Sequence, residues 1–298
     1  MPYFTTSDNV QIYYEERGKD KEKTIIFIHG WASDHSAYHE SAEFLKKWYH
    51  CVSFDLRGCG ASSRPRTGYS MAKCARDMKE LIEELELENV ALFGASLGTS
   101  VIYAYVRDYG CRYLDRVILA DMPPRLIADD SPEHPWKWGL YRGDNTGENL
   151  LANMGRMFED FDEYVLWHVE MCMPAAYKIA GLPDDFRQAI GTEALPPEAR
   201  DLVSKGLCRD LDPLAITAFA YFTIYEDYRD VLPSITVPAA VFYPNPGSIY
   251  VPEAMEYVAD HVGGPVRKVE FKPATHMFLL EHKERSMAEL IDFMEAEF

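Results

Sequence analysis

The 298-residue chain lacks an apolar run that could cross a bilayer, since no segment reaches the roughly 18 to 20 uninterrupted apolar residues that a membrane helix needs. It also lacks positive charge: 30 Lys and Arg stand against 48 Asp and Glu, a formal net charge of -18. Such a charge repels polyphosphate backbones and anionic bilayers, so we expect no nucleic-acid and no membrane partner. Residues 1–8 have neither the basic start nor the apolar stretch of a secretory leader, which predicts a mature cytoplasmic chain.

Paired cysteine motifs are absent as well. The six cysteines are scattered, without a Cys-x-x-Cys pair: Cys51, Cys59, Cys74, Cys111, Cys172 and Cys208. A chain of this length buries a large core without disulfides, so we expect free and mostly buried thiols.

Buried-strand patterns alternate with helix patterns over the first 121 residues. Thr24–Ile28 is a continuous apolar run typical of a strand covered on both faces, and Cys51–Asp55 and Arg116–Asp121 are further strands. The apolar spacing of Met71–Leu85 predicts a helix, with Ser70 as its N-cap. Strand, helix, strand, helix in this order predicts a mostly parallel sheet with right-handed crossovers.

The pattern changes between residues 122 and 232, where helical stretches rich in Trp, Tyr and Met are broken by prolines. We interpret this segment as an inserted helical cap. Strand patterns resume at Pro238–Tyr243 and Val266–Phe271. The predicted core is therefore residues 1–121 with 233–298, and the predicted cap is residues 122–232. The other core helices are expected at Ser36–Lys47, Pro252–His261 and Lys283–Ala296.

The segment from Gly94 to Gly98 reads Gly-Ala-Ser-Leu-Gly between a short apolar strand and an expected helix. A serine at such a strand-to-helix turn projects its hydroxyl into a cleft, and the small neighbours let strand and helix approach closely. The alternative is a glycine-containing loop that happens to hold a serine. The context favours Ser96 as a nucleophile.

With these motifs in order, the chain resembles the α/β-hydrolase superfamily, and within it the capped small esterases and cofactor-free haloperoxidase-like enzymes. The resemblance rests on His29-Gly30-Trp31, on Asp55–Gly60, on the serine turn, and on Ala274-Thr275-His276 after the last strand. It covers nearly the whole core. It implies a mostly parallel eight-stranded sheet flanked by helices, with an inserted helical cap.

A neutral hydroxyl is a poor nucleophile and needs a base. His276 follows the final core strand, on a loop that the superfamily brings back over the serine, so the resemblance implies that His276 is this base. His168, His261 and His282 lack that context.

The superfamily completes the serine and histidine with an acid that orients the histidine, which makes a catalytic triad. In this chain the position of that acid departs from the commoner pattern. Related enzymes usually carry it in the turn after the strand Val241–Tyr243, but here Pro244–Tyr250 holds no carboxylate and Gly247 stands at the expected place. A second known arrangement puts the acid one strand earlier, where this chain has Asp121. The alternative for Asp121 is a carboxylate that caps a turn. Other candidates for the third member are Asp227, Glu253 and Glu256, or the amide of Asn245.

Acyl transfer also needs donors for the oxyanion. The superfamily uses two backbone N–H groups, which here map to Trp31 and Leu97. The resemblance makes Asp55 and Glu281 structural acids, and Arg57 part of a structural turn.

His29, His35 and His39 suggest a metal, but no convincing further ligand accompanies them, so we expect no metal and no cofactor. The leading hypothesis is a serine hydrolase that cleaves a small or medium, largely apolar carboxylic ester, thioester or lactone through an acyl-enzyme on Ser96. Alternatives are a cofactor-free carbon-carbon bond hydrolase or dioxygenase, or a non-catalytic binding protein. The expected partner is a small apolar acyl compound, with the chain a monomer or homodimer.

Overall fold

The computed structural model describes residues 2–130, 132, 135–139, 160, 211–247 and 249–298. Most of the predicted cap, including His168, therefore lies outside the described residues. Among the helices within them, none is both long enough and apolar enough to span a membrane.

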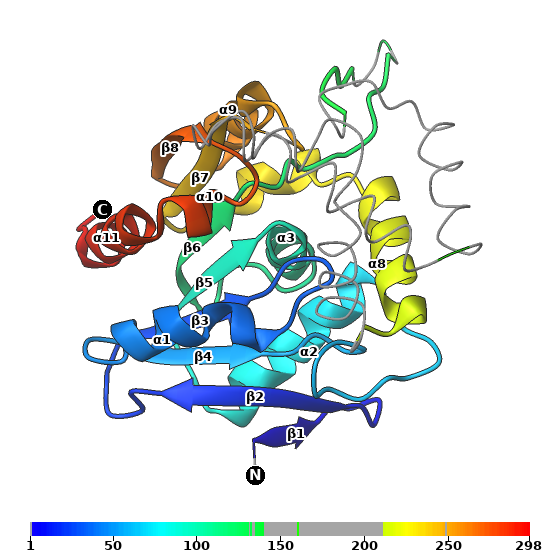
Figure 1. Cartoon of the computed structure of the whole chain (residues 1–298), viewed down its shortest axis with the longest axis vertical. Helices are drawn as coiled ribbons and strands as arrows, with labels where there is room; N and C mark the ends of the chain where they lie inside the picture. Colours follow the sequence, from blue (N-terminus) through cyan, green and yellow to red (C-terminus); the bar gives the residue numbers. More distant parts are fainter. Residues whose placement is uncertain (1, 131, 133–134, 140–159, 161–210, 248) are drawn as a thin grey trace, which may run out of the picture.

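One sheet of eight strands forms the centre of the described residues (Figure 1). The strands are β1 Tyr3–Thr5, β2 Gln11–Arg17, β3 Thr24–Ile28, β4 His50–Phe54, β5 Val90–Ala95, β6 Leu114–Ala120, β7 Ala239–Pro246 and β8 Val266–Ala274. Their order is β1-β2-β4-β3-β5-β6-β7-β8; β1 and β2 pair antiparallel, as do β2 and β4, and all later pairs are parallel. The predicted α/β-hydrolase sheet is confirmed.

Helices cover both faces of this sheet (Figure 1). An apolar cluster on one face joins the strands to α2 Met71–Glu84, α3 Leu97–Tyr109 and α9 Pro252–His261. A second cluster on the other face joins them to α1 His39–Leu45, α10 Phe278–Glu281 and α11 Lys283–Glu295. All five residues of β3 and of β4 are buried, as expected for strands covered on both sides.

Local signals account for several helix ends. Ser70 accepts a hydrogen bond from the Lys73 backbone N–H, which confirms it as the N-cap of α2. The helix predicted over Ser36–Lys47 is in two parts, a 3-10 turn η1 at His35–Tyr38 followed by α1. Asp34 causes this earlier start, because its carboxylate caps the turn by accepting from Ser36 N at 2.8 Å.

The two ends of the predicted cap meet beside the carboxyl edge of the sheet. Arg125 forms a β-bridge with Asp227, and its guanidinium lies 2.6 Å from that carboxylate. Arg229 binds the same carboxylate at 2.6 Å. Asp227 follows the helix α8 Pro213–Tyr225, whose N-cap is Asp212. The Arg125–Asp227 pair joins residues 102 positions apart, at the two ends of the predicted cap.

Glu226 lies at the C-terminus of α8 in this junction, and burial raises its pKa to about 7. Arg107 partly opposes the shift, with Nη1 3.8 Å from Oε2. The folded-state pKa exceeds the ordinary value of 4.5, so folding favours the protonated form. This contribution to stability is present below pH 4.5 and is lost as the pH rises through about 7.

Glu226→Gln should remove this pH dependence. Between about pH 5 and about pH 8, the thermal midpoint of the wild type should fall further than that of the variant, because only the wild type ionises the partly buried carboxyl of Glu226. Glu256→Gln, an exposed change on α9, is the control and should follow the wild type. Parallel curves for wild type and Glu226→Gln would contradict the prediction.

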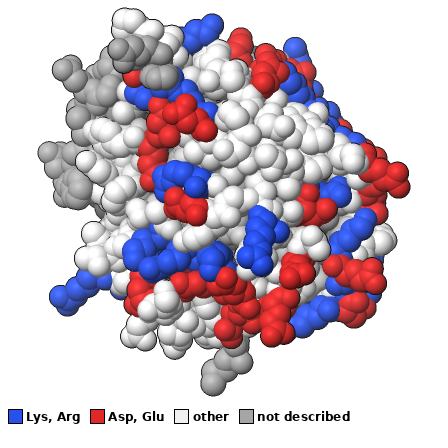
Figure 2. Space-filling model, turned by 180° about the vertical axis from the view of Figure 1, so that it is seen from behind, with Lys and Arg blue, Asp and Glu red and all other residues white. Residues whose placement is uncertain are grey.

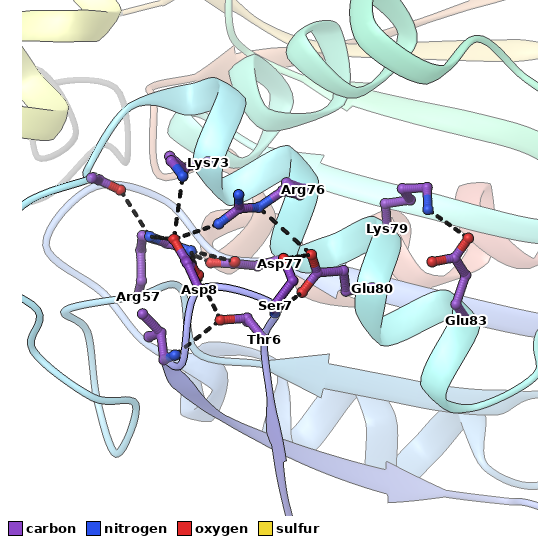
Figure 3. Close-up of polar contacts among 12 residues, drawn as sticks. Thr6, Ser7, Asp8, Arg57, Lys73, Arg76, Asp77, Lys79, Glu80 and Glu83 are labelled. Carbon is purple, nitrogen blue, oxygen red and sulfur yellow. Dashed lines mark hydrogen bonds and ion pairs between the residues drawn. The ribbon is translucent and has the colours of Figure 1, made fainter.

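Charged side chains of both signs lie side by side over much of the surface seen in Figure 2. A group of charged side chains surrounds Arg57, which is 1% exposed (Figure 3). Its Nε and Nη2 donate to the two oxygens of Asp77 on α2 at 2.6 and 2.5 Å. Nη1 and Nη2 each lie 3.2 Å from Asp8, in the turn between β1 and β2. Arg57 thus ties the N-terminal hairpin to α2, a structural role as predicted.

Asp77→Asn should lower the free energy of unfolding by about 3 kcal/mol, because it leaves a buried guanidinium with less compensating charge. Lys79→Ala is the matched control on the same helix. It breaks the i,i+4 pair with Glu83 on the exposed face, which contributes about 0.5 kcal/mol or less. Urea denaturation measures both; equal losses in the two variants would contradict the prediction.

Candidate active site

Ser96 occupies a strained turn between β5 and α3. Its φ of 52° and ψ of -123° match the first central residue of a type II′ turn, a conformation dominated by glycine. Backbone strain of this kind costs about 1 to 3 kcal/mol and persists only where surrounding structure imposes it. Here Ser96 N donates to Ala120 O at 2.8 Å, and Ser96 O accepts from Thr99 N at 2.8 Å.

The two flanking glycines are required by close backbone contacts. A Cβ at Gly94 would lie 2.6 Å from the carbonyl carbon of Gly98, and one at Gly98 would lie 2.2 Å from Ile28 O. Thr99, which the sequence analysis did not single out, secures the turn: its Oγ1 donates to Gly94 O at 2.6 Å and accepts from Ala120 N at 3.2 Å. The sequence feature that could have indicated this role is a hydroxyl residue in the first turn of the helix after the serine.

Asp121 and His276 meet directly. Asp121 leaves β6 with a positive φ of 47°, and its N–H donates to Phe242 O at 2.9 Å. His276 Nδ1 lies 2.6 Å from Asp121 Oδ2. Because a carboxylate only accepts, we assign the proton to Nδ1, which leaves Nε2 as the acceptor of the imidazole.

Asp121 is 1% exposed, and this burial raises the pKa of its carboxyl, while the hydrogen bond and charge of His276 oppose the rise. Its Oδ1 accepts no hydrogen bond from any of the described residues. A carboxylate held this way gains stabilisation when the facing imidazole becomes positively charged.

Sheet register brings the three side chains to one edge. Ala95 and Ala120 are paired in the parallel ladder, so Ser96 and Asp121 leave neighbouring strands. His276 follows β8, on a loop fixed by Glu281, whose carboxylate accepts from Thr275 N at 2.9 Å and Thr275 Oγ1 at 2.5 Å. The structure thus brings Asp121 to His276 at the edge that carries Ser96; their catalytic roles stay predictions.

The predicted oxyanion donors border the same turn. A Cβ at Gly30 would lie 3.5 Å from Ser96 Cβ, so the loop that leads into Trp31 passes next to the serine. Leu97 opens α3, and N–H groups in a first helical turn have no intrahelical acceptor. The Trp31 indole donates from Nε1 to Ile216 O on α8 at 2.9 Å.

The other candidates for the residue that orients His276 make different contacts or lie at the surface. Asp227 is bound to Arg125 and Arg229, which hold the pKa of its carboxyl at about 2. Glu253 and Glu256 are exposed on α9. The Asn245 side-chain amide donates to Glu270.

The other described histidines are engaged locally. Leu56 N donates to His29 Nε2 at 3.0 Å, so Nδ1 carries the proton and donates to Gly30 O at 2.9 Å. Burial lowers the pKa of His29, in keeping with this neutral form. His261 and His282 contact the carbonyls of Tyr257 and Pro273.

The three histidines considered for a metal do not converge. His29 is bound as above, and His39 Nδ1 lies 2.9 Å from Arg17. Asp34, His35 and Asp55 do lie within reach of one ion, but Asp55 accepts from His35 N and Nδ1, both at 2.7 Å, and from Ala61 N at 2.8 Å. The absence of a metal stays a prediction.

An apolar cluster stands beside His276. It consists of Met122, Leu126, Ile224, Ile249 and Tyr250, with Trp31, Ile127 and Ala220 packed against it. The ring of Tyr250 meets the imidazole in a T-shaped contact, with the centroids 5.8 Å apart. The surroundings of the serine edge are therefore largely apolar on this side.

A family model described as the α/β-hydrolase fold matches residues 23–164, which include Trp31, Ser96 and Asp121. The chain is 33% identical over 137 residues to a non-heme chloroperoxidase of Burkholderia pyrrocinia, covering 44% of this chain and 49% of that protein. It is 29% identical over 164 residues to a bifunctional esterase/perhydrolase of Acinetobacter calcoaceticus, covering 54% of this chain and 58% of that protein. The chain thus spans about half the length of the curated relatives it matches.

Structural similarity extends further than sequence similarity. An esterase from Exiguobacterium antarcticum superposes with a TM-score of 0.80 over 99% of each chain, at 23% sequence identity. At this identity the likeness establishes the fold.

Proposed function

We propose that this chain, which belongs to the α/β-hydrolase superfamily, is a serine hydrolase that forms an acyl-enzyme on Ser96. The observation that carries the proposal is the 2.6 Å contact between His276 Nδ1 and the buried Asp121 carboxylate. This contact lies at the same edge of the sheet as the strained turn that holds Ser96. This arrangement leaves Nε2 as the base for a hydroxyl.

In the proposed reaction, His276 Nε2 removes the Ser96 proton as Oγ attacks the substrate carbonyl. The N–H groups of Leu97 and Trp31 stabilise the oxyanion. The imidazolium returns the proton to the leaving group, and water, activated by the same imidazole, then releases the acid. Asp121 holds the imidazole tautomer throughout and offsets its positive charge.

The substrate we propose is a small or medium, largely apolar carboxylic ester, thioester or lactone. Support comes from the cluster beside His276, whose Met, Leu, Ile and Tyr side chains make this side of the site apolar. The names of the relatives fit this chemistry, because a perhydrolase makes a peracid when hydrogen peroxide replaces water at the same acyl-enzyme.

A fluorophosphonate probe tests the proposal. The native protein should be labelled stoichiometrically at Ser96, located by peptide mass spectrometry, because the activated hydroxyl displaces fluoride from phosphorus. Denatured protein is the control and should not react. A folded protein that stays unlabelled, with Ser96 accessible, would rule out the acyl-enzyme.

One observation also suits a second reaction class. The buried Asp121–His276 pair can act as a base toward a substrate's own proton, as in a cofactor-free carbon-carbon bond hydrolase or dioxygenase. Absence of labelling together with turnover of such a substrate would favour that class.

A further inference from the structure

The turn after β7, where related enzymes carry the triad acid, brings an aromatic ring to His276 instead. Gly247 N donates to Ala274 O at 3.2 Å, which joins this turn to the end of β8, two residues before His276. Gly247 has a φ of +72°, and a Cβ there would lie 2.3 Å from Tyr250 O. The turn therefore folds tightly and places Tyr250 next to the imidazole.

Tyr250 contacts His276 and the residue that follows Asp121. Its ring makes the T-shaped contact with the His276 imidazole, at 5.8 Å between centroids. Its hydroxyl donates to Met122 Sδ at 3.2 Å, and Met122 is the residue that follows Asp121. Tyr250 is 5% exposed, so its ring is fixed in place by this packing.

A ring packed beside the Asp121–His276 pair affects two of its properties, the orientation of the imidazole plane and the access of water to the carboxylate. The torsion that rotates an imidazole is broad, so hydrogen bonding alone defines the ring plane loosely. Asp121 also has one oxygen, Oδ1, that accepts no hydrogen bond from the described residues. Water reaching this oxygen would hydrate the carboxylate and compete with His276 for it.

We propose that Tyr250 is a positioning residue, whose ring fixes the plane of the His276 imidazole and excludes water from the Asp121–His276 hydrogen bond. This inference rests on the proposed function for its catalytic meaning. The hydrogen bond itself can be observed whether or not an ester is cleaved.

The test compares Tyr250→Leu, which removes the ring, with Tyr250→Phe, which keeps it. Tyr243→Leu is the matched control, because Tyr243 is also 5% exposed but packs in the core cluster on the sheet face that carries α2, α3 and α9. Circular dichroism checks folding, and Tyr250→Met replaces Tyr250→Leu if the latter does not fold.

The first measurement is the proton resonance of His276 Nδ1–H. A proton held between imidazole and carboxylate resonates far downfield and is visible only when exchange with water is slow. We expect a sharp signal in the wild type, Tyr250→Phe and Tyr243→Leu, and a broadened or absent one in Tyr250→Leu. A signal of unchanged width in Tyr250→Leu would overturn the proposal.

The second measurement is turnover of an activated ester. Tyr250→Leu should lower kcat about tenfold with little change in KM, the size expected from losing one aromatic pair at a positioned group. Tyr250→Phe should stay within about twofold of the wild type, since a thioether is a weak acceptor. An equal loss of kcat in Tyr250→Leu and Tyr243→Leu would assign the effect to packing and overturn the positioning role. If the wild type cleaves no ester, the proposed function fails, while the resonance still decides the role of Tyr250.

Discussion

Replacing Ser96 with alanine is expected to lower kcat for an activated ester such as p-nitrophenyl butyrate by about 10⁵- to 10⁶-fold, the loss typical of removing a nucleophile from an acyl-transfer site. Alanine has a Cβ like serine, so it keeps the backbone strain of the turn and removes only the hydroxyl. Initial rates at saturating ester measure the loss. Ser100→Ala, a buried serine four residues further along α3, is the control and should keep its activity.

A second substitution of Ser96 tests the effect of its backbone strain on stability independently of its effect on activity. Ser96→Gly should be equally inactive but more stable by about 1 kcal/mol, because glycine adopts the φ of 52° without strain. Thermal unfolding compares Ser96→Gly with Ser96→Ala. Residual activity within tenfold of the wild type in either variant would place the nucleophile elsewhere.

Asp121→Asn should lower kcat by about 10³- to 10⁴-fold. An amide can present its NH₂ to Nδ1 and so stabilise the tautomer that carries the proton on Nε2, where a base is needed. It also has no charge to offset the imidazolium. The thermal midpoint should not fall, since burial already raises the pKa of Asp121 and the change removes a buried charge.

Asp115→Asn provides the control for this substitution. Asp115 lies on β6, the strand that Asp121 follows, its side chain is 42% exposed, and it pairs with Arg116. Its loss should leave turnover unchanged. A loss of less than tenfold in a folded Asp121→Asn variant would mean that another group orients His276.

The parts of the molecule that sequence predicted best are those set by local physics. The apolar runs of β3 and β4, the Ser70 cap and the two glycines beside Ser96 each follow from neighbouring residues and are found as expected. The expectation for Asp121 needed one further fact, the resemblance to a superfamily in which the acid can follow β6.

The features that sequence did not predict depend on residues distant in the chain. The contact of Tyr250 with His276 forms where the turn after β7 meets the end of β8, at the hydrogen bond between Gly247 and Ala274. Arg125 and Asp227 are 102 positions apart, and neither residue carries a local signal for the other. A charge or a ring can be read from sequence, but the partner it meets is decided by the packing of separate elements.

The separation between Asp121 and His276 also bears on how the chain assembles. They are 155 positions apart, and the whole predicted cap lies between them. During synthesis Ser96 and β6 emerge before β8, so the growing chain holds the serine before it holds the base. Because the proposed base lies after β8, reactivity toward a fluorophosphonate should arise only once the C-terminal strands have joined the sheet, and it should report that step.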